Sequence, residues 1–320
     1  GQVSGSGWIT RHLQRAANLP PAIQLPALAA NSGQPLSLLA YPDAVAMSGP
    51  SAFRFNGRTS SLAGQTYSYW QQQSLRQMYS GGAWLESAGR ETLDTLTVVQ
   101  SAGNYTPANG AVYPSGSFGN SLRTVAQMIK LNVGLQVATI DFGGWDTHEY
   151  QGAATGYMQG LLDQLARGLA AFYTDLNGAG AADYMANTTV VVMSEFGRRL
   201  RENRSQGTDH GHGSAMVVMG GPVIGGRLYG RWPGLANEQL FDRADLAVTT
   251  DYRTVLSEIL VRRLGNSALD VIFPGLTQYL PLGLMQGSDL PVNLTPAPPD
   301  PPRTSLGQDI ILPTDGRGST

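Results

Sequence analysis

Three of the four histidines of the chain lie in two short motifs, residues 143–148 and residues 207–213, which also carry two aspartates. A neutral imidazole offers a nitrogen lone pair, and a carboxylate offers negative charge that offsets a divalent cation. Such a set of side chains is therefore suited to holding a divalent metal ion. The candidate ligands are Asp146, His148, Asp209, His210 and His212.

The spacing within each motif brings pairs of these side chains to one side of the chain. Residues two apart point the same way in an extended segment, so Asp146 can face the same point as His148. The same holds for His210 and His212, with Asp209 as a further ligand or as the partner that orients a histidine. Loop histidines hydrogen-bonded to carboxylates without any metal are the alternative, but two motifs after successive predicted strands favour a metal ion. Its identity stays open among zinc, manganese and calcium.

A third motif, residues 194–198, follows a predicted strand. Glu195 is a carboxylate at the strand end and is a further candidate metal ligand, and Arg198 is a candidate for binding an anionic substrate. The alternative is the N-terminus of a helix, where Ser194 would cap and Glu195 would complement the helix dipole. The sequence leaves both interpretations open.

The predicted strands and helices indicate how these motifs could meet. Apolar runs predict strands at 134–141, 188–193 and 215–219, and an apolar stripe at helical spacing predicts a helix at 158–176. Alternation of helices with apolar strands predicts an α/β fold with a mainly parallel sheet, whose strand-end loops gather the motifs. Further helices are predicted at 8–17, from an N-cap at Ser121, within 62–90 with aromatic side chains in the core, and after an N-cap at Asp251.

Composition excludes several other classes of protein. The chain has 320 residues, of which 14% are charged, and its net charge of -2 argues against a nucleic-acid partner. It has no cysteine, so disulfides and thiolate chemistry are excluded, and its short apolar runs predict no transmembrane segment. With 40 glycines and 19 prolines, long irregular loops are expected. We expect one domain over 1–290 and a Pro-rich linker and tail over 291–320, in which the run 310–312 would dock as a strand.

The motifs resemble those of the bacterial "domain of unknown function 1501" family. The resemblance spans about residues 7 to 275 and implies a place in the alkaline-phosphatase and sulfatase superfamily. It implies a three-layer fold with a mainly parallel central sheet. It also implies a twin-arginine export signal, and thus a periplasmic, extracellular or cell-surface protein. The matching stretches are residues 7–11, 143–148, 194–198, 207–212, 249–253 and 273–275.

The resemblance also implies roles for single residues. Asp146 and His148 resemble the first Asp/His pair of the superfamily, and one of His210 and His212 resembles its last metal histidine. Residues 194–197 stand where the superfamily has Ser-Asp-His-Gly, but they contain Glu and Phe in place of Asp and His. Phenylalanine cannot bind a metal, so one ion is expected rather than two. The superfamily's nucleophile comes from a loop after its first strand, where this family usually has a Gly-Gly-x-Asp-Gly segment. That loop lies upstream of these residues, so the resemblance names no catalytic residue here.

The function that the resemblance implies is metal-dependent hydrolysis of a small anionic ester, either a phosphate or a sulfate, or descent from such an enzyme. The alternative is a non-catalytic extracellular surface or assembly protein that retains the fold, with or without one structural ion. The resemblance implies that the superfamily's first strand lies centrally in the sheet and upstream of these residues. Without it, backbone groups in the middle of the sheet would stay unpaired. We therefore expect a second polypeptide, a homo-oligomer or another part of the same polypeptide to complete the sheet. A self-contained sheet around Val137 would refute this.

Overall fold

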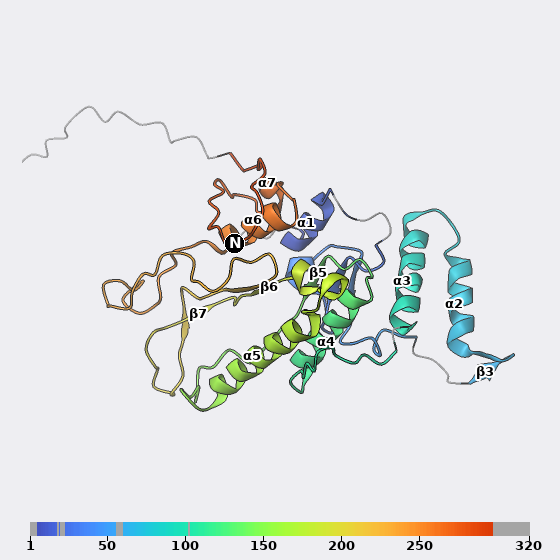
Figure 1. Cartoon of the computed structure of the whole chain (residues 1–320), viewed down its shortest axis with the longest axis horizontal. Coiled ribbons are helices and arrows are strands. Elements are labelled where there is room, and N and C mark those ends of the chain that lie inside the picture. Colours follow the sequence, from blue (N-terminus) through green and yellow to red (C-terminus); the bar gives the residue numbers. More distant parts are fainter. Residues whose placement is uncertain (1–4, 18, 20–22, 56–59, 102, 297–320) are drawn as a thin grey trace, which may run out of the picture.

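The computed structural model describes residues 5–17, 19, 23–55, 60–101 and 103–296, so the strand predicted at 310–312 lies outside the described residues. These residues form a mixed α/β structure with a small parallel sheet and helices on both of its sides (Figure 1). The helices are α1 (Trp8–Arg15), α2 (Tyr67–Met78), α3 (Trp84–Ser101), α4 (Ser117–Lys130), α5 (Tyr157–Leu176), α6 (Tyr252–Glu258) and α7 (Leu269–Ile272). The strands are β1 (Ala27–Ala29), β2 (Ala44–Ala46), β3 (Ser61–Leu62), β4 (Gln65–Thr66), β5 (Val137–Thr139), β6 (Thr189–Val192), β7 (Gly197–Arg198), β8 (His210–Gly211) and β9 (Val217–Gly220).

The parallel sheet has the order β2-β1-β5 within the described residues. β1 lies in its middle, and all three of its residues are fully buried. Side chains alternate between the two faces of a strand: Leu28 packs in the core with α4 and α5, whereas Ala27 and Ala29 pack in the core with α1. Helices therefore cover both faces, as in other parallel sheets.

β6 confirms the strand predicted after α5, but its pairing differs from the expected parallel one. It pairs with β9 in antiparallel register, from Thr189 opposite Gly220 to Val192 opposite Val217. Val190 packs in the core with α4 and α5, and Val191 packs on the opposite side against α6 and α7. The described part of the fold thus combines a parallel sheet with three separate antiparallel pairs, β3–β4, β6–β9 and β7–β8.

A helix is present in each region where one was predicted, and one predicted N-cap is wrong. The stripe predicted at 158–176 forms α5, and Asp251 caps α6 by accepting a hydrogen bond from the Arg253 backbone amide at 2.8 Å. The predicted N-cap at Ser121 is wrong, because α4 begins four residues earlier, after Gly116 at a φ of 100°. Ser121 lies inside the helix, and its hydroxyl donates to the Ala30 carbonyl at 2.6 Å. It thereby ties α4 to the end of β1.

Three of the aromatic residues predicted to lie in the core are partly exposed. Residues 62–90 form α2 and the start of α3, a hairpin that stands away from the rest of the molecule (Figure 1). Tyr67, Tyr69 and Trp70 of α2 are 39–40% exposed. An ion pair of 2.7 Å between Arg76 and Asp94 joins α2 to α3. Periodicity predicted the helices correctly, but it could not show that α2 packs mainly against one neighbour.

The last described residues continue to pack on the same chain. The Asn293 backbone amide donates to the Ser267 carbonyl at 2.9 Å, and the Thr295 amide donates to the Leu276 carbonyl at 3.0 Å. Both contacts hold the segment after Pro291 against the region of α7. In the part of the chain that the structure describes, we find no helix with the length and apolar character needed to cross a membrane.

A buried histidine makes the stability of this fold sensitive to acid. His12 of α1 is 4% exposed, and its Nδ1 accepts a hydrogen bond from the Asn266 side-chain amide at 2.9 Å. Burial lowers the pKa of His12 to about 4, against about 6.5 in an unfolded chain. The folded state therefore binds fewer protons between these values, so stability is full above about pH 6.5 and falls as the pH drops towards 4.

We expect this one group to remove about 3 kcal/mol of the free energy of unfolding over that pH range. Urea denaturation at a series of pH values would measure it. A His12→Gln variant keeps a hydrogen-bond acceptor but cannot gain a proton, so its stability should fall less steeply with acid. Equal pH profiles for the two proteins would assign the acid sensitivity to other groups.

Candidate metal site

The first two motifs meet through a loop and a short hairpin. The loop that follows β5 carries Asp146, Thr147 and His148, and the antiparallel pair β7–β8 places Arg198 opposite His210. Thr147 is 4% exposed and points inward, so its two neighbours project to the other side of the chain. The alternation predicted for this motif is thus present.

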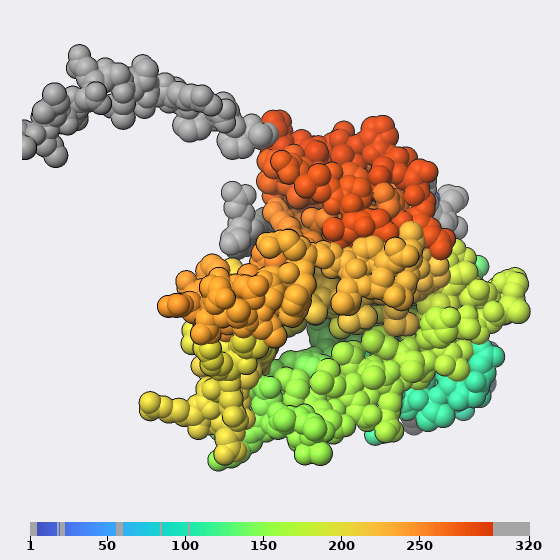
Figure 2. Space-filling model, turned by 60° about the vertical axis from the view of Figure 1, so that its left-hand side comes forward, coloured from blue at the N-terminus to red at the C-terminus, as the bar shows by residue number. Residues whose placement is uncertain are grey.

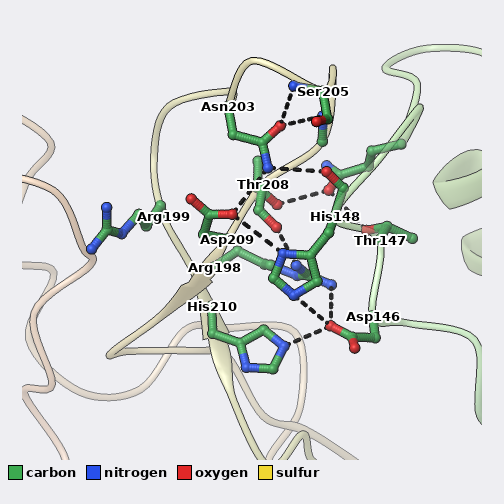
Figure 3. Close-up of polar contacts among 12 residues, drawn as sticks. Asp146, Thr147, His148, Arg198, Arg199, Asn203, Ser205, Thr208, Asp209 and His210 are labelled. Atoms are coloured by element: carbon green, nitrogen blue, oxygen red, sulfur yellow. Dashed lines mark hydrogen bonds and ion pairs between the residues drawn. The ribbon is translucent and has the colours of Figure 1, made fainter.

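Asp146, His148 and His210 form a compact group (Figure 3). The Asp146 Oδ1 lies 2.6 Å from the His210 Nε2 and 3.0 Å from the His148 Nε2. One ligand atom from each residue lies within 4.8 Å of the other two. The three side chains are 63%, 43% and 48% exposed, in that order. Three protein ligands that open to solvent leave room for further ligands on an ion.

Asp209 lies behind His148 and holds its orientation. Its Oδ1 is 3.3 Å from the His148 Nδ1, so the imidazole stands between two carboxylates. A carboxylate on one ring nitrogen fixes the tautomer and leaves the other nitrogen for a metal. Hydrogen bonds from Asn203, and then from His148, lower the pKa of Asp209. Asp209 therefore stays ionised, and its contact with the His148 Nδ1, outside the group of possible ligands found among the described residues, suits it to the orienting role.

Asn203 was not among the predicted residues, yet it connects the two motifs. Its side-chain amide donates to the Asp209 Oδ1 and to the His148 carbonyl, both at 3.0 Å. Its Oδ1 accepts hydrogen bonds from the backbone amides of Ser205 and Gly207, which closes a turn. The only sequence signal is the run Asn-Arg-Ser-Gln-Gly, whose composition is typical of turns. That signal predicts a turn but not a contact with a motif 55 residues away.

Arg198 bridges the same loops from the other side. Its guanidinium donates to the carbonyl oxygens of Thr208 and Trp145, and it lies 3.7 Å from the Asp146 Oδ1. Two of its nitrogens are thus engaged with backbone, and its side chain is 19% exposed. Arg198 positions the two motifs and adds positive charge beside Asp146. Substrate binding by this residue stays a prediction.

A hydrogen bond and the nearby Arg198 guanidinium help to hold Asp146 in the ionised state that a metal ligand needs. The hydrogen bond from His210 lowers the pKa of Asp146 most, and slight burial opposes it. The charges of His148, His210 and Arg198 lower it further. The donor set of one carboxylate and two imidazoles fits a borderline ion such as zinc, because imidazole nitrogen suits zinc and calcium prefers oxygen ligands.

The model of one protein family covers this site. The family described as "Protein of unknown function (DUF1501)" matches residues 4–267, which include all three motifs. The chain belongs to this family. No curated protein and no solved structure matches the chain significantly. The family resemblance seen in the motifs is thereby confirmed for this DUF1501 chain.

Besides Asp209, two predicted ligands of the DUF1501 chain lie outside the compact group. The ring of His212 stacks on Phe241 with centroids 4.0 Å apart, and Glu195 is exposed and does not belong to the group of possible ligands found among the described residues. Phe196, which cannot bind a metal, stacks on His210 at 4.0 Å with an interplanar angle of 9°. Its aromatic face restricts the rotation of the His210 ring. The helix considered at 194–198 is not formed either, since β7 begins there.

Glycine is required where the motifs touch. A Cβ atom at Gly207 would lie 2.2 Å from the His148 carbonyl carbon and oxygen, and one at Gly211 would lie 2.4 Å from the Arg198 carbonyl carbon. Real Cβ atoms do not approach backbone this closely. Only glycine lets the loop of Asp209 lie directly on the loop of His148.

Proposed function

We propose that this DUF1501 chain is an exported, metal-dependent hydrolase of phosphate or sulfate esters with an alkaline-phosphatase-like three-layer fold. The observation that carries the proposal is the group of Asp146, His148 and His210. It joins residues up to 64 positions apart and is open to solvent. Helices on both faces of a parallel sheet support the proposed fold. Placement outside the cytoplasm follows from the family resemblance alone.

The side chains of the group suit this chemistry in distinct ways. A divalent ion bound there would polarise an ester oxygen and make bound water more acidic. Asp146 would offset part of the positive charge, and the Nε2 atoms of His148 and His210 would be the nitrogen ligands. Asp209 would keep His148 in the tautomer that leaves Nε2 free. The Arg198 guanidinium, next to Asp146, would favour an anionic ester over a neutral one.

A second candidate is a non-catalytic extracellular surface or assembly protein, with or without one structural ion. The exposed aromatic side chains of α2 favour it. A cavity of about 410 Å³ beside this helix is lined by Phe55, Tyr67, Trp70 and Leu75, among others. Apolar surface of this kind is typical of contacts with other proteins. Under this proposal the metal group would stabilise the loops and would not turn over a substrate.

Elemental analysis of the purified protein would test the metal site and separate these functions. We expect one equivalent of a divalent metal in the native chain and none in a His148→Ala/His210→Ala double variant. His212→Ala removes a histidine outside the group, so it should leave the metal content unchanged. The same three proteins would then be assayed with 4-nitrophenyl phosphate and 4-nitrophenyl sulfate.

Hydrolysis that depends on the metal and disappears in the double variant would support the hydrolase. Bound metal without hydrolysis of either ester would favour the assembly protein. A native chain that binds no metal after incubation with zinc or manganese would overturn the hydrolase and leave the assembly protein without an ion.

A further inference from the structure

Four arginines lie within residues 198–204, and the first two of them face different parts of the surface. Arg198 lies beside Asp146 in the metal group. Side chains of neighbouring strand residues point to opposite sides, so Arg199 projects to the other side of the chain. Figure 3 shows Arg199 on the far side of Asp209 from Asp146. Arg199 thus faces a part of the surface that the metal group does not occupy.

A pocket of about 350 Å³ lies on this far side. Three arginines line it, namely Arg199, Arg201 and Arg204. Two carboxylates, Glu202 and Asp209, also belong to its wall. Guanidinium groups therefore outnumber carboxylates around the pocket.

Two of the three arginines have no carboxylate partner. In the part of the chain that the structure describes, neither Arg201 nor Arg204 forms an ion pair, although Arg201 donates a hydrogen bond to the Asn237 side-chain oxygen. Arg199 lies 3.5 Å from the Asp245 Oδ1, but its side chain stays 52% exposed. A guanidinium has five N–H donors and no acceptor. These side chains therefore keep donors that an anion could use.

The negative charge of the pocket is partly engaged elsewhere. The Asp209 Oδ1 accepts a hydrogen bond from the Asn203 side chain at 3.0 Å and lies 3.3 Å from the His148 Nδ1. Its charge is thus shared with donors on the side of the metal group. Glu202 is exposed and forms no ion pair among the described residues. The three arginines consequently face one carboxylate whose charge is not compensated.

Contacts with another segment hold the loop of arginines in place. The Leu200 backbone amide donates to the Ala244 carbonyl at 3.0 Å. The turn that Asn203 closes by accepting from the Gly207 amide carries Arg204. In the space-filling view, the yellow segment around residue 200 lies directly below the gold and orange segment around residue 240, on the outside of the molecule (Figure 2). A loop that is already ordered loses less entropy when it binds a ligand.

We propose that this pocket binds a phosphate or sulfate group through Arg199, Arg201 and Arg204, at a site separate from the metal group. Such a group carries about two negative charges and several acceptor oxygens. The planar guanidinium donates to these oxygens in pairs, which favours phosphate and sulfate over anions with a single acceptor atom. The inference goes beyond the proposed hydrolysis and does not depend on it, because no ligand of the metal group lines the pocket.

Isothermal titration calorimetry of the full chain with sodium phosphate and with sodium sulfate would test this site. The titrations would be run at constant ionic strength, with the metal-loaded protein and after removal of divalent metal by a chelator. We expect Arg201→Gln/Arg204→Gln to weaken binding by about tenfold or more in both states. Arg227→Gln/Arg231→Gln removes two exposed arginines outside the pocket and should weaken binding by less than about twofold. Glu202→Gln should strengthen it, because a negative charge leaves the wall.

Glucose 6-phosphate, titrated in the same way, distinguishes the two sources of such a group. Binding that is tighter than that of phosphate and is lost in the Arg201/Arg204 variant would identify an ester on a larger molecule as the ligand. Weaker binding would identify the free ion. Circular dichroism and thermal denaturation would show that each variant folds.

Three results would overturn the proposal. The first is that neither ion binds measurably. The second is an equal loss in the two double arginine variants, because net charge rather than the pocket would then attract the anions. The third is binding that requires the metal, since the anion would then belong to the metal group. Retained anion binding in a protein that hydrolyses neither ester would leave this inference intact and count against the proposed hydrolysis alone.

Discussion

Replacing Asp175 with asparagine is expected to lower the free energy of unfolding by about 3–5 kcal/mol, the usual cost of breaking a buried ion pair. Its carboxylate is fully buried in α5 and lies 2.5 Å from the Lys130 Nζ of α4. It also accepts hydrogen bonds of 2.7 Å from the Tyr105 and Tyr113 hydroxyls and from the Ala108 amide. One side chain thus holds two helices and the loop before α4 together. Asparagine would present an amide to donors and leave the Lys130 charge without a counterion.

Asp163 provides a matched control on the same helix. It pairs with Arg167 at 2.9 Å, but both side chains are exposed, so an Asp163→Asn change should cost less than about 1 kcal/mol. Chemical denaturation of the three proteins would measure both losses.

Burial raises the pKa of Asp175, but the hydrogen bonds from Lys130 and the tyrosines outweigh it and lower the pKa overall. Its contribution is therefore present above about pH 4 and is lost as the pH falls through the lowered pKa. Equal losses at Asp163 and Asp175 would contradict the role of burial.

A graded series of variants at the metal group should show the second large effect. Asp146 touches both histidines, so Asp146→Asn should weaken zinc binding by more than about a hundredfold, because the only carboxylate of the group loses its charge. Asp209→Asn keeps the three proposed ligands and removes a partner of His148. It should weaken binding by about 10–100-fold, the range typical of such partners. His212→Ala should change the affinity by less than about twofold.

Competition with a chromogenic zinc chelator would rank the three variants. Thermal denaturation in the presence of chelator would show that each variant still folds. The order of affinities is the decisive result, since a loss at His212 as large as that at Asp146 would mean that the ligands differ from the compact group. If the Asp209→Asn variant binds zinc as tightly as the native protein, Asp209 does not orient His148 for metal binding.

Local sequence patterns predicted the strongest elements and part of the site. The apolar runs of β6 and α5 and the cap at Asp251 depend on near neighbours in the chain, so periodicity and capping rules were enough. The rule that strand-end loops gather at one edge of a sheet predicted that the motifs of Asp146 and His210 would meet, although β5 and β6 lie in separate sheets and His210 lies in the β7–β8 hairpin. The antiparallel partner of β6 could not be predicted in this way, because pairing direction depends on contacts distant in sequence.

The errors at single residues have local physical causes. His212 was paired with His210 on the assumption of a continuing extended strand, but β8 ends at Gly211, and His212 then turns to stack on Phe241. The roles of Asn203 and Asp175 were not predicted, because a single polar residue forms no periodic pattern in the sequence. Their importance comes from donors and acceptors 55 to 70 positions away. Only the three-dimensional arrangement brings these partners together.

The contact between Asp146 and His210 gives the chain a means of cross-linking itself. It joins residues 64 positions apart in a protein without cysteine. An ion held by both would close the same kind of loop as a disulfide of that span, for which the reduced entropy of the unfolded chain amounts to about 4 kcal/mol. Unlike a disulfide, this metal cross-link would be broken by a chelator and would not be affected by reductants. The resistance of residues 149–209 to proteases would then follow the supply of metal in the surroundings of the protein.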